Sequence, residues 1–543
     1  MRRVFSHILA LIALVLIGAA LPSCEKAVPL IQHPEKQDVV KAWLSLDLDV
    51  LSSGAATKAA AEVPGGDNKG IDENTIKSLV IWLVPAPGGV EKWSETVMTH
   101  VSHLALTSGD NYLASVQTML NVPMNVYVGA NLSTNIADAF LAGGPNTVYS
   151  AAVSADYPEM VADLASADRG VAMFCVKKTG VTFTTAHLDK STPAEASIEL
   201  VRMLAKVHVL FQCYDSPNDG YVRITHPGSM TPADFGEFGW SKLEDISYIV
   251  NTVNKTTQIF QPAYSSGPDY SLYKDLNHSM TDLLQKGLEW DYKAGADVNF
   301  LGFAEDLSGD HETTWTKWSA KPEKYIVNKA PFGTCTDGSY VQGLYCMENT
   351  TDNSAVALMT SDEAKFVPFM VATHVIVKAR FVPRVIKKVV SGVLVDVDYG
   401  VDRYDLALAA LPEVVGEDEN GDPHTYPAGT FFTRDMKNFY DYYGMLKLIE
   451  TEPGLTRKNF AAYPGGYGFY YSYIHGGQDV TTGQVTFNGE QSGVFRNHYH
   501  ILSCSLMKVP ATPGSFDQLM MVNSKVVDWN PKGALNLIVK PSL

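Results

Sequence analysis

The chain has 543 residues and a formal net charge of −17, with 46% hydrophobic and 19% charged residues. This length exceeds what one ordinary hydrophobic core accommodates, so we expect two domains or three. Such an acidic chain lacks the Lys and Arg excess that neutralises phosphate groups, which argues against binding to nucleic acid and against adsorption to anionic lipid. Acidity of this kind also keeps a secreted protein soluble.

The first residues have the parts of a secretory signal. Arg2 and Arg3 precede a long apolar run, and small residues stand just before Cys24. A cysteine directly after such a break is where a lipid thioether forms, so we predict a signal peptide over 1–23 and a lipidated Cys24 at the start of the mature chain. Two alternatives stay open: an uncleaved transmembrane anchor, since the run is nearly long enough to span a bilayer, and ordinary secretion in which Cys24 has no role.

Alternation of apolar and polar residues dominates the rest of the chain. In 42–51, Leu44, Leu46, Leu48 and Val50 alternate with polar residues. Short runs rich in β-branched and aromatic residues recur after it, separated by turns that contain Gly and Pro. Many short strands separated by turns that contain Gly and Pro predict an all-β protein with minor helices, built as β-sandwiches.

A strand is predicted near each end of the chain, and each is set off by a loose segment. Residues 51–70 are rich in Ser, Gly and Ala and predict a linker after the first strand. The last predicted strand covers 534–540, where Leu535, Leu537 and Val539 share one face. Both strands can also be ordinary edge strands of their own domains, and the pattern leaves this open.

Nothing in the sequence has the spacing of a catalytic or metal site, so we expect no enzyme activity, no cofactor and no metal. His311 and Glu312 begin an H-E-x-x-H-like string, but Trp315 stands where the second His must be. His498 and His500 would share a strand face and could in principle chelate a metal, although a hydrogen-bonded pair is the simpler interpretation.

Two further features have open interpretations. Of the six cysteines, Cys335 and Cys346 flank a Gly-containing stretch and could pair in an oxidising compartment, whereas Cys175 lies in an apolar run and is expected to be a buried thiol. The aromatic run from Tyr463 to Tyr473 could stack on sugars, or could be a strand with one buried face.

Several strings taken together resemble the fimbrillins of Bacteroidales, the subunits of lipoprotein-derived (type V) pili. In chain order they are L-P-S-C at 21–24, the alternating strand at 42–51 with its linker, L-V-R-M-L-A-K-V at 200–207, Y-G-F-Y-Y-S-Y-I at 467–474, G-V-F-R-N-H-Y at 493–499, and the alternating last strand. The resemblance covers nearly the whole chain and is strongest for the major subunits of short fimbriae.

The resemblance implies two tandem β-sandwich (transthyretin-like) domains. A propeptide over 24–58 would carry the removable first strand, an N-terminal domain would cover 59–262, and a C-terminal domain would cover 263–543. It also implies export as a lipoprotein to the outer membrane, cleavage in the linker, and assembly into a cell-surface fimbria that supports adhesion. The donor strand 534–540 of another subunit would fill the groove that the first strand leaves, and this head-to-tail contact would build a filament.

The processing site departs from the family pattern. The fimbrillin cut usually follows Arg, whereas the basic residues of this linker are Lys58 and Lys69, so Lys58 is the predicted site and the protease must accept Lys. The implied partners are other copies of the chain and related subunits, the outer membrane through Cys24 before processing, and a host surface or glycan. The alternative function is a monomeric surface lipoprotein that binds a glycan or a host ligand.

Overall fold

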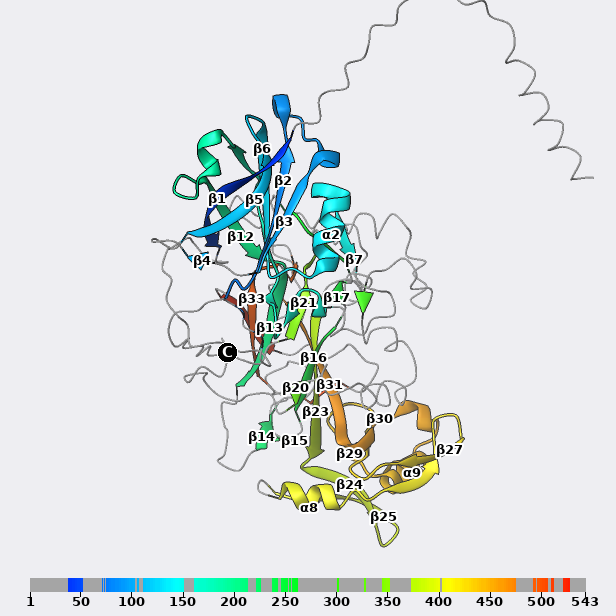
Figure 1. Ribbon diagram of the computed structural model, residues 1–543. Coiled ribbons are helices and arrows are strands. Elements are labelled where there is room, and N and C mark those ends of the chain that lie inside the picture. Colours follow the sequence, from blue (N-terminus) through cyan, green and yellow to red (C-terminus); the bar gives the residue numbers. More distant parts are fainter. Residues whose placement is uncertain are drawn as a thin grey trace, which may run out of the picture.

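The computed structural model describes residues 38–51, 71, 73, 75–102, 105–106, 111–150, 161–212, 221–225, 237–242, 246–251, 253–254, 256–261, 300–301, 327–328, 344–351, 373–400, 403–474, 492–494, 496–505, 509–511 and 521–527. These residues form two β-rich modules and a smaller subdomain, arranged along one elongated molecule (Figure 1). Strands far outnumber helices, which confirms the predicted all-β fold with minor helices. Among the described residues, no helix is long and apolar enough to cross a bilayer.

The N-terminal module is a nine-stranded sheet that curls around its own core. Its strands are β1 (Val39–Val50), β2 (Leu79–Pro85), β3 (Val97–Val101), β4 (Ala105–Leu106), β5 (Tyr112–Met119), β6 (Pro123–Ala130), β10 (Met173–Cys175), β11 (Thr179–Thr182) and β12 (Ala194–Arg202). Their order is β3-β2-β6-β10-β12-β1-β5-β4, and β11 also pairs with β6. Strands β3 and β5 lie toward opposite ends of this order and yet contact one another, so the sheet closes into a sandwich.

An apolar strand and a capped helix build the core of this module. Every residue of β2 is buried. Helix α2 (Thr134–Gly143) begins after Ser133, whose Oγ accepts a backbone N–H of the first turn at 3.4 Å. The Phe140 ring of this helix lies 5.0 Å from the ring of Trp82 and 4.7 Å from that of Phe174. The helix therefore covers the aromatic part of the core.

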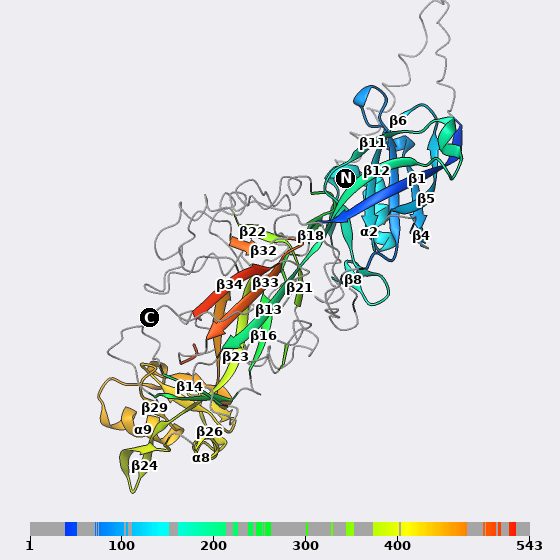
Figure 2. The ribbon, with the colours of Figure 1, turned by 90° about the vertical axis from the view of Figure 1, so that its left-hand side faces the viewer.

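The C-terminal module is a sandwich of two sheets (Figure 2). One sheet has the order β21-β13-β33-β34, with bounds β21 (Leu344–Met347), β13 (Leu204–Gln212), β33 (Tyr499–Ser505) and β34 (Met521–Val527). The other has the order β14-β15-β23-β16-β20 with β31 also paired to β23, and its bounds are β14 (Tyr221–Ile224), β15 (Gly239–Lys242), β23 (His374–Pro383), β16 (Ser247–Asn251), β20 (Val327–Asn328) and β31 (Tyr467–Tyr473). Val207 and Leu502 of the first sheet share a buried cluster with Val375 and Val377 of the second.

The chain passes from the first module to the second at Met203. Strand β12 ends one residue before it in the nine-stranded sheet, and β13 begins one residue after it in the C-terminal module. Residues 256–261, called the returning segment here, come back to the N-terminal module: β18 (Thr256–Gln258) pairs with β7 (Val148–Ser150), and the ring of Phe260 lies 5.4 Å from that of Tyr127. The sequence analysis predicts a domain boundary at 262, whereas strands β13 to β16, within 204–251, already belong to the sheets of the C-terminal module.

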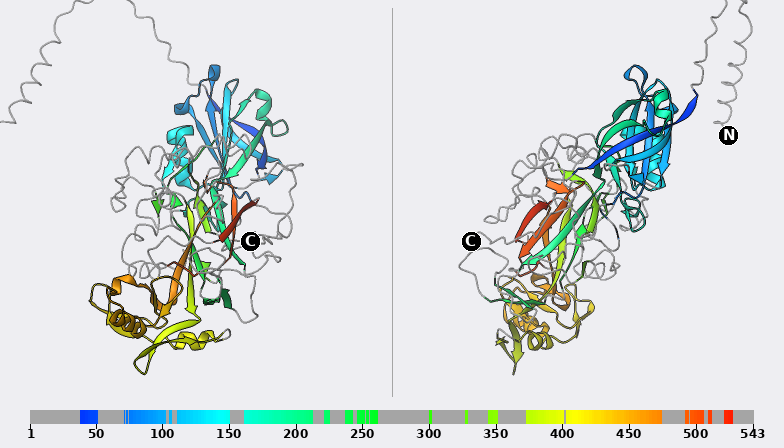
Figure 3. Two further views of the ribbon diagram at one scale, coloured as in Figure 1. Left: turned by 180° about the vertical axis from the view of Figure 1, so that it is seen from behind. Right: turned by 60° about the vertical axis from the view of Figure 1, so that its left-hand side comes forward.

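A distal subdomain is inserted between β23 and β31, at the end of the molecule away from the N-terminal module (Figure 3). Its sheet has the order β25-β24-β29-β28-β30, with β25 (Val393–Asp398), β24 (Val385–Val390), β29 (Phe439–Tyr440), β28 (Phe431–Thr433) and β30 (Ala461–Tyr463), beside helices α8 (Tyr404–Ala409) and α9 (Tyr442–Thr451) and the hairpin of β26 (Val414–Glu417) and β27 (Pro423–Tyr426). Ser391 and Gly392 have φ values of 53° and 82°, which is the backbone that a two-residue hairpin turn between β24 and β25 requires.

Short pairs complete the described strands. They are β8 (Ala165–Ser166) with β9 (Gly170–Val171), β17 (Val253–Asn254) with β19 (Phe300–Leu301), and β22 (Asn349–Thr351) with β32 (Ser492–Val494). In the last of these pairs, β22 directly follows Glu348 and β32 ends two residues before Arg496; both side chains lie at the junction of the modules.

Candidate functional site

Strand β1 is an inner strand of the nine-stranded sheet and is paired on both sides (Figure 2). It runs parallel to β12 over seven residue pairs and antiparallel to β5 over eight. Strands β5 and β4 join the rest of the sheet through β1. Taking β1 away therefore leaves a slot, which we define as the space between β12 and β5, with unpaired backbone groups along both walls.

The inward face of β1 fills the core of the module. Leu44 and Leu46 are completely buried, and Leu48 and Val50 are half-buried and pack against the same cluster. All four residues therefore face inward, as their alternation indicates. A fully buried Leu side chain contributes about 1.5–3 kcal/mol, so the strand is held most firmly in its middle, at Leu44 and Leu46.

The outward face of β1 places carboxylates beside carboxylates of β12. Asp49 lies opposite Glu199, and Asp47 lies opposite Ser197, between Glu195 and Glu199. Lys177 offsets part of this charge because its Nζ lies 2.7 Å from the carboxylate of Glu199. Like charges opposite one another destabilise a strand pair by about 0.2–1 kcal/mol. The apolar face and the backbone hold β1 in place, and its outward charges oppose them.

Asn497 of the C-terminal module closes one end of the slot. It is completely buried, with a φ of 59°, in the left-handed region that Asn enters more readily than most residues. Its Nδ2 donates to the backbone oxygen of Leu51 at 2.8 Å. Its Oδ1 accepts from the backbone N–H and from Nη1 of Arg202, both at 3.2 Å. One side chain of the second module thus bonds the ends of both β1 and β12.

Glu73 anchors the chain beyond the linker at the same junction. Its carboxylate accepts from Lys206 Nζ at 2.8 Å and from the hydroxyl of Tyr345, and its backbone oxygen accepts from Arg202 Nε at 3.1 Å. The ion pair with Lys206 is buried. Burial lowers the pKa of the Lys206 ammonium, and the Glu73 carboxylate opposes that shift. Leu51 and Glu73 are held by different partners, so a cut between them leaves the contacts of Glu73 in place.

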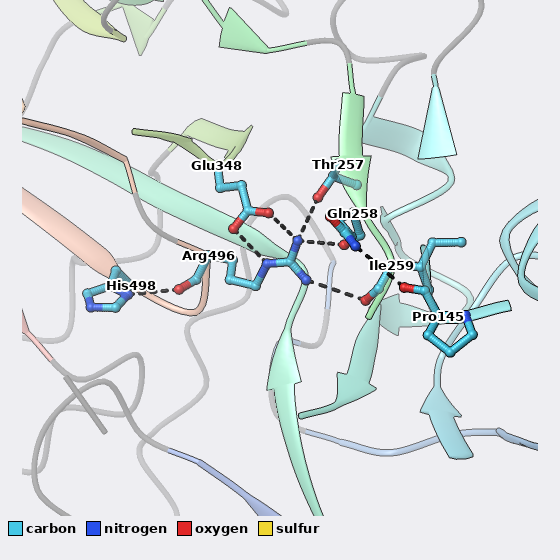
Figure 4. Close-up of polar contacts among 7 residues, drawn as sticks. All are labelled: Pro145, Thr257, Gln258, Ile259, Glu348, Arg496 and His498. Carbon is cyan, nitrogen blue, oxygen red and sulfur yellow. Dashed lines mark hydrogen bonds and ion pairs between the residues drawn. The ribbon is translucent and has the colours of Figure 1, made fainter. Parts of the chain in front are cut away.

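Arg496 holds the returning segment from the position next to Asn497 (Figure 4). Its completely buried guanidinium donates twice to the carboxylate of Glu348, from Nε to Oε2 at 2.7 Å and from Nη2 to Oε1. Nη2 also donates to the backbone oxygen of Gln258 at 2.6 Å, and Gln258 Nε2 donates to the backbone oxygen of Pro145 at 3.4 Å. Arg496 and Asn497 therefore bind two separate segments that join the modules.

The remaining predicted site residues lie outside the described part of the chain. They are the lipidation site Cys24, the processing site Lys58, and the donor residues Leu535, Leu537 and Val539. Their roles stay predictions.

The aromatic run does not offer Phe469 and Tyr470 as a platform for sugars. Both side chains are buried in β31, which pairs with β23. Tyr463 is buried as well: its hydroxyl donates to the backbone oxygen of Pro510 at 2.6 Å, and its ring stacks on that of Phe431 at 4.5 Å. Of the two open interpretations of this run, the strand with a buried face applies to Tyr470, because a completely covered ring cannot stack on a ligand.

His498, His500, Cys175 and Cys346 are buried. His498 and His500 have ring centroids 5.8 Å apart, and in the described part of the chain no group of three or more His, Cys, Asp or Glu is placed to hold a metal ion. Cys175 and Cys346 are buried free thiols, and burial raises the pKa of Cys175 to about 12. Cys335 lies outside the described residues.

The sequence analysis singled out the segments 200–207 and 493–499, which lie at the junction of the modules. It did not predict which residues their side chains contact. Arg202 and Lys206 stand in an otherwise apolar strand run, and a charge in such a run signals a buried counter-charge, because Arg and Lys are seldom fully buried unpaired. This signal predicts that partners exist. It does not identify Glu73, which lies 133 positions from Lys206.

No family model matches this sequence, and no curated protein matches it. Several solved structures are similar to the chain. A protein assigned to cell adhesion from Parabacteroides distasonis ATCC 8503 is 10% identical, with 91% of this chain and 100% of that chain covered and a TM-score of 0.42. A fimbrilin from Porphyromonas gingivalis W83 is 12% identical, with 90% and 96% covered and a TM-score of 0.36. A fimbrial assembly protein from P. distasonis is 11% identical, with 41% and 67% covered and a TM-score of 0.21.

These structures and the resemblance found in the sequence name the same group of proteins, the fimbrillins and related adhesion proteins. The identities and TM-scores are low. We therefore base the function on the geometry of this chain.

Proposed function

We propose that the chain is a structural subunit of a cell-surface fimbria. In this proposal it is exported as a lipoprotein on Cys24, is cut after Lys58, and polymerises when β1 leaves the slot and strand 534–540 of another copy enters it. The observation that carries the proposal is the placement of β1: an inner strand, paired on both sides, that precedes a linker whose far end is anchored separately by Glu73. Such a strand can be exchanged without loss of the chain that follows it.

The sequence of strand 534–540, called the tail here, has the apolar spacing that the slot requires. Leu535, Leu537 and Val539 repeat the apolar spacing of the inward face of β1, and burying three such side chains contributes about 5–8 kcal/mol before ordering costs. The outward positions of the tail include Asn536 and Lys540 and no carboxylate. A tail strand would keep the apolar contacts of β1 and would remove its like-charge contacts with β12.

The slot and the origin of the tail lie in different modules. The slot belongs to the N-terminal module, whereas β34, the last described strand before the tail, belongs to the C-terminal module (Figure 2). A contact from the tail of one copy to the slot of the next joins two unlike surfaces. Contacts of this kind do not close on themselves in pairs, so they generate a filament.

Trimming the purified chain with a lysine-specific protease tests the proposal. We expect the trimmed full-length chain to form a ladder of SDS-resistant oligomers on a gel, because a buried strand holds each subunit to the next. A matched variant carrying Lys58→Gln and Lys69→Gln keeps its linker intact and should stay monomeric. A second variant that lacks residues 534–543 is trimmed normally and should also stay monomeric. A trimmed full-length chain that remains monomeric at high concentration overturns the proposal.

A further inference from the structure

We propose that the two walls of the slot act differently during strand exchange. Strand β12 is a fixed wall, on which the strand of another copy first pairs. Strand β5, together with β4, is a movable wall that swings away with β1 and closes again over the strand that replaces it. This inference rests on the proposed function and adds to it the route by which one strand replaces another.

The backbone of β5 is attached to the sheet mainly through β1. Strand β5 forms eight residue pairs with β1, and its other strand partner is the two-residue β4 at the edge of the sheet. Among the described residues, β5 and β4 therefore share no strand pairing with the rest of the sheet once β1 has left. Their hold then depends on side chains and on the turn that follows β5.

The inward side chains of β5 are small. Ala114, Val116 and Thr118 are buried, and Tyr112, the largest side chain on this face, is only half-buried. Ala114 lies opposite Leu44 of β1, whose larger side chain is completely buried. Hydrophobic stabilisation grows with the apolar area removed from water, so β5 contributes less to the core than β1 does. Without β1, little apolar burial keeps β5 in place.

The turn after β5 fastens that end of the strand. Asn121 has a φ of 60°, in the left-handed region, and its N–H donates to the backbone oxygen of Phe183 at 2.7 Å. Leu120 forms a bridge with Phe183, and Met119 at the end of β5 is buried. The other end of β5 is paired with β4 at the sheet edge. Strand β5 can therefore swing about this turn while remaining part of the module.

Strand β12 is held independently of β1. On the side away from β1 it pairs with β10 from Leu200 to Arg202. The hydroxyl of Thr179 donates to the backbone oxygen of Ser197 at 3.0 Å, and Ile198 is completely buried. These contacts remain when β1 leaves, so β12 becomes an edge strand in an unchanged position. An extended strand adds to such an edge through main-chain hydrogen bonds.

Unequal walls determine how a strand enters. Between two fixed walls, a strand has to thread lengthwise and make its pairs on both sides at once. With β5 swung away, the incoming strand meets β12 from the side and pairs with it residue by residue. Strand β5 then closes over the new strand and regains its own pairing. The docking surface is therefore β12, and its occupant is the tail of a second copy.

Native-state hydrogen exchange of the uncut chain, read by mass spectrometry at low denaturant, tests the movable wall. Segments that open together as one cooperative unit share one opening free energy. We expect 39–50 and 112–119 to exchange together. A slowly exchanging set of amides should remain in 194–202, because β10 still pairs with this strand. This comparison needs no variant.

Leu46→Ala and Asp47→Ala form a matched pair that tests the coupling of β5 to β1. Leu46 is completely buried, whereas Asp47 is exposed on the outward face. Leu46→Ala should speed exchange in 39–50 and in 112–119 by the same factor, about 30-fold to several thousand-fold, and should leave the slow amides of 194–202 unchanged. Asp47→Ala should not speed exchange in either segment. Thermal unfolding checks that both variants fold.

The outcomes separate this inference from the proposed function. Protection of 112–119 that equals that of 194–202 would show two fixed walls and overturn the inference. Faster exchange of the slow amides of 194–202 in Leu46→Ala would show that both walls open, and would also overturn it. These measurements need no polymer, so the proposed function stands in either case. A trimmed chain that forms no ladder overturns the proposed function and the docking on β12, whereas the movable wall stands.

Discussion

After a cut at Lys58 in a chain that lacks the tail residues 534–543, we expect β1 to stay in its slot because no strand displaces it, and we expect Leu46→Ala to release it. The cut leaves a peptide held only by noncovalent contacts. Those contacts are pairing with β12 and β5 along almost the whole strand, the burial of Leu44 and Leu46, and the bond from Asn497 to Leu51. Release of β1 is therefore a separate step from cleavage, and it depends on the inward face of the strand.

The size of the effect follows from burial. Leu46 is completely buried in the core cluster, and replacing such a residue by Ala costs about 2–5 kcal/mol. This corresponds to a loss of roughly 30-fold to several thousand-fold in the affinity of the cut peptide. Leu48→Ala on the same face should have a smaller effect because Leu48 is only half-buried. Asp47→Ala, on the exposed outward face, serves as the matched control and should not release the peptide.

Gel filtration followed by mass spectrometry measures the retained peptide. In the cut chain that lacks residues 534–543, and in its Asp47→Ala variant, the peptide should elute with the large fragment. In Leu46→Ala it should elute separately at the same protein concentration. Equal release from the wild-type chain and from Leu46→Ala would show that the inward face does not hold β1, and the reasoning from burial would be refuted.

Three further predictions concern single side chains. Glu73→Gln should lower the free energy of unfolding by about 3–5 kcal/mol in a denaturant titration because it leaves the buried Lys206 without its counter-charge. Adding Lys206→Met should recover part of the loss. No recovery in the double variant would contradict the pairing. Asp49→Asn should slow release of the cut peptide at low salt by removing the repulsion of about 0.2–1 kcal/mol with Glu199. The difference in release rate between the variant and the wild-type chain should shrink at high salt. Faster release from the variant at low salt would contradict the repulsion. Tyr470→Ala should lower the melting temperature through loss of a buried ring, and an unchanged melting temperature would show that the ring does not belong to the core.

The first strand was predictable from its sequence because its face follows from a local rule. In a strand, alternate side chains point to opposite sides, so the spacing of Leu44 to Val50 alone indicates which residues are buried. The neighbours of the strand follow no such rule. The pairing with Leu200 depends on how far-apart segments meet, and the bond from Asn497 to Leu51 joins residues 446 positions apart.

The distal subdomain shows a different limit. Its aromatic core, with Phe432 and Tyr442 among its members, comes from very short strands and a helix of ten residues, and such short runs give no clear period in the sequence. The start of helix α9 did carry a local signal, because the side chain of Asp441 accepts the backbone N–H of Gly444 at 2.7 Å. Capping residues predict where a helix begins, but not that the segment forms a separate subdomain.

The composition of the purified polymer tests the central claim most directly. Mass spectrometry of SDS-resistant ladders, after dissociation by heat, counts the peptide up to Lys58 against the rest of the chain. Strand exchange predicts that the polymer lacks this peptide, while trimmed monomer from the same preparation retains it. Ladders that hold one copy of the peptide per subunit would mean that the slot is still filled by β1, and would contradict assembly by strand exchange.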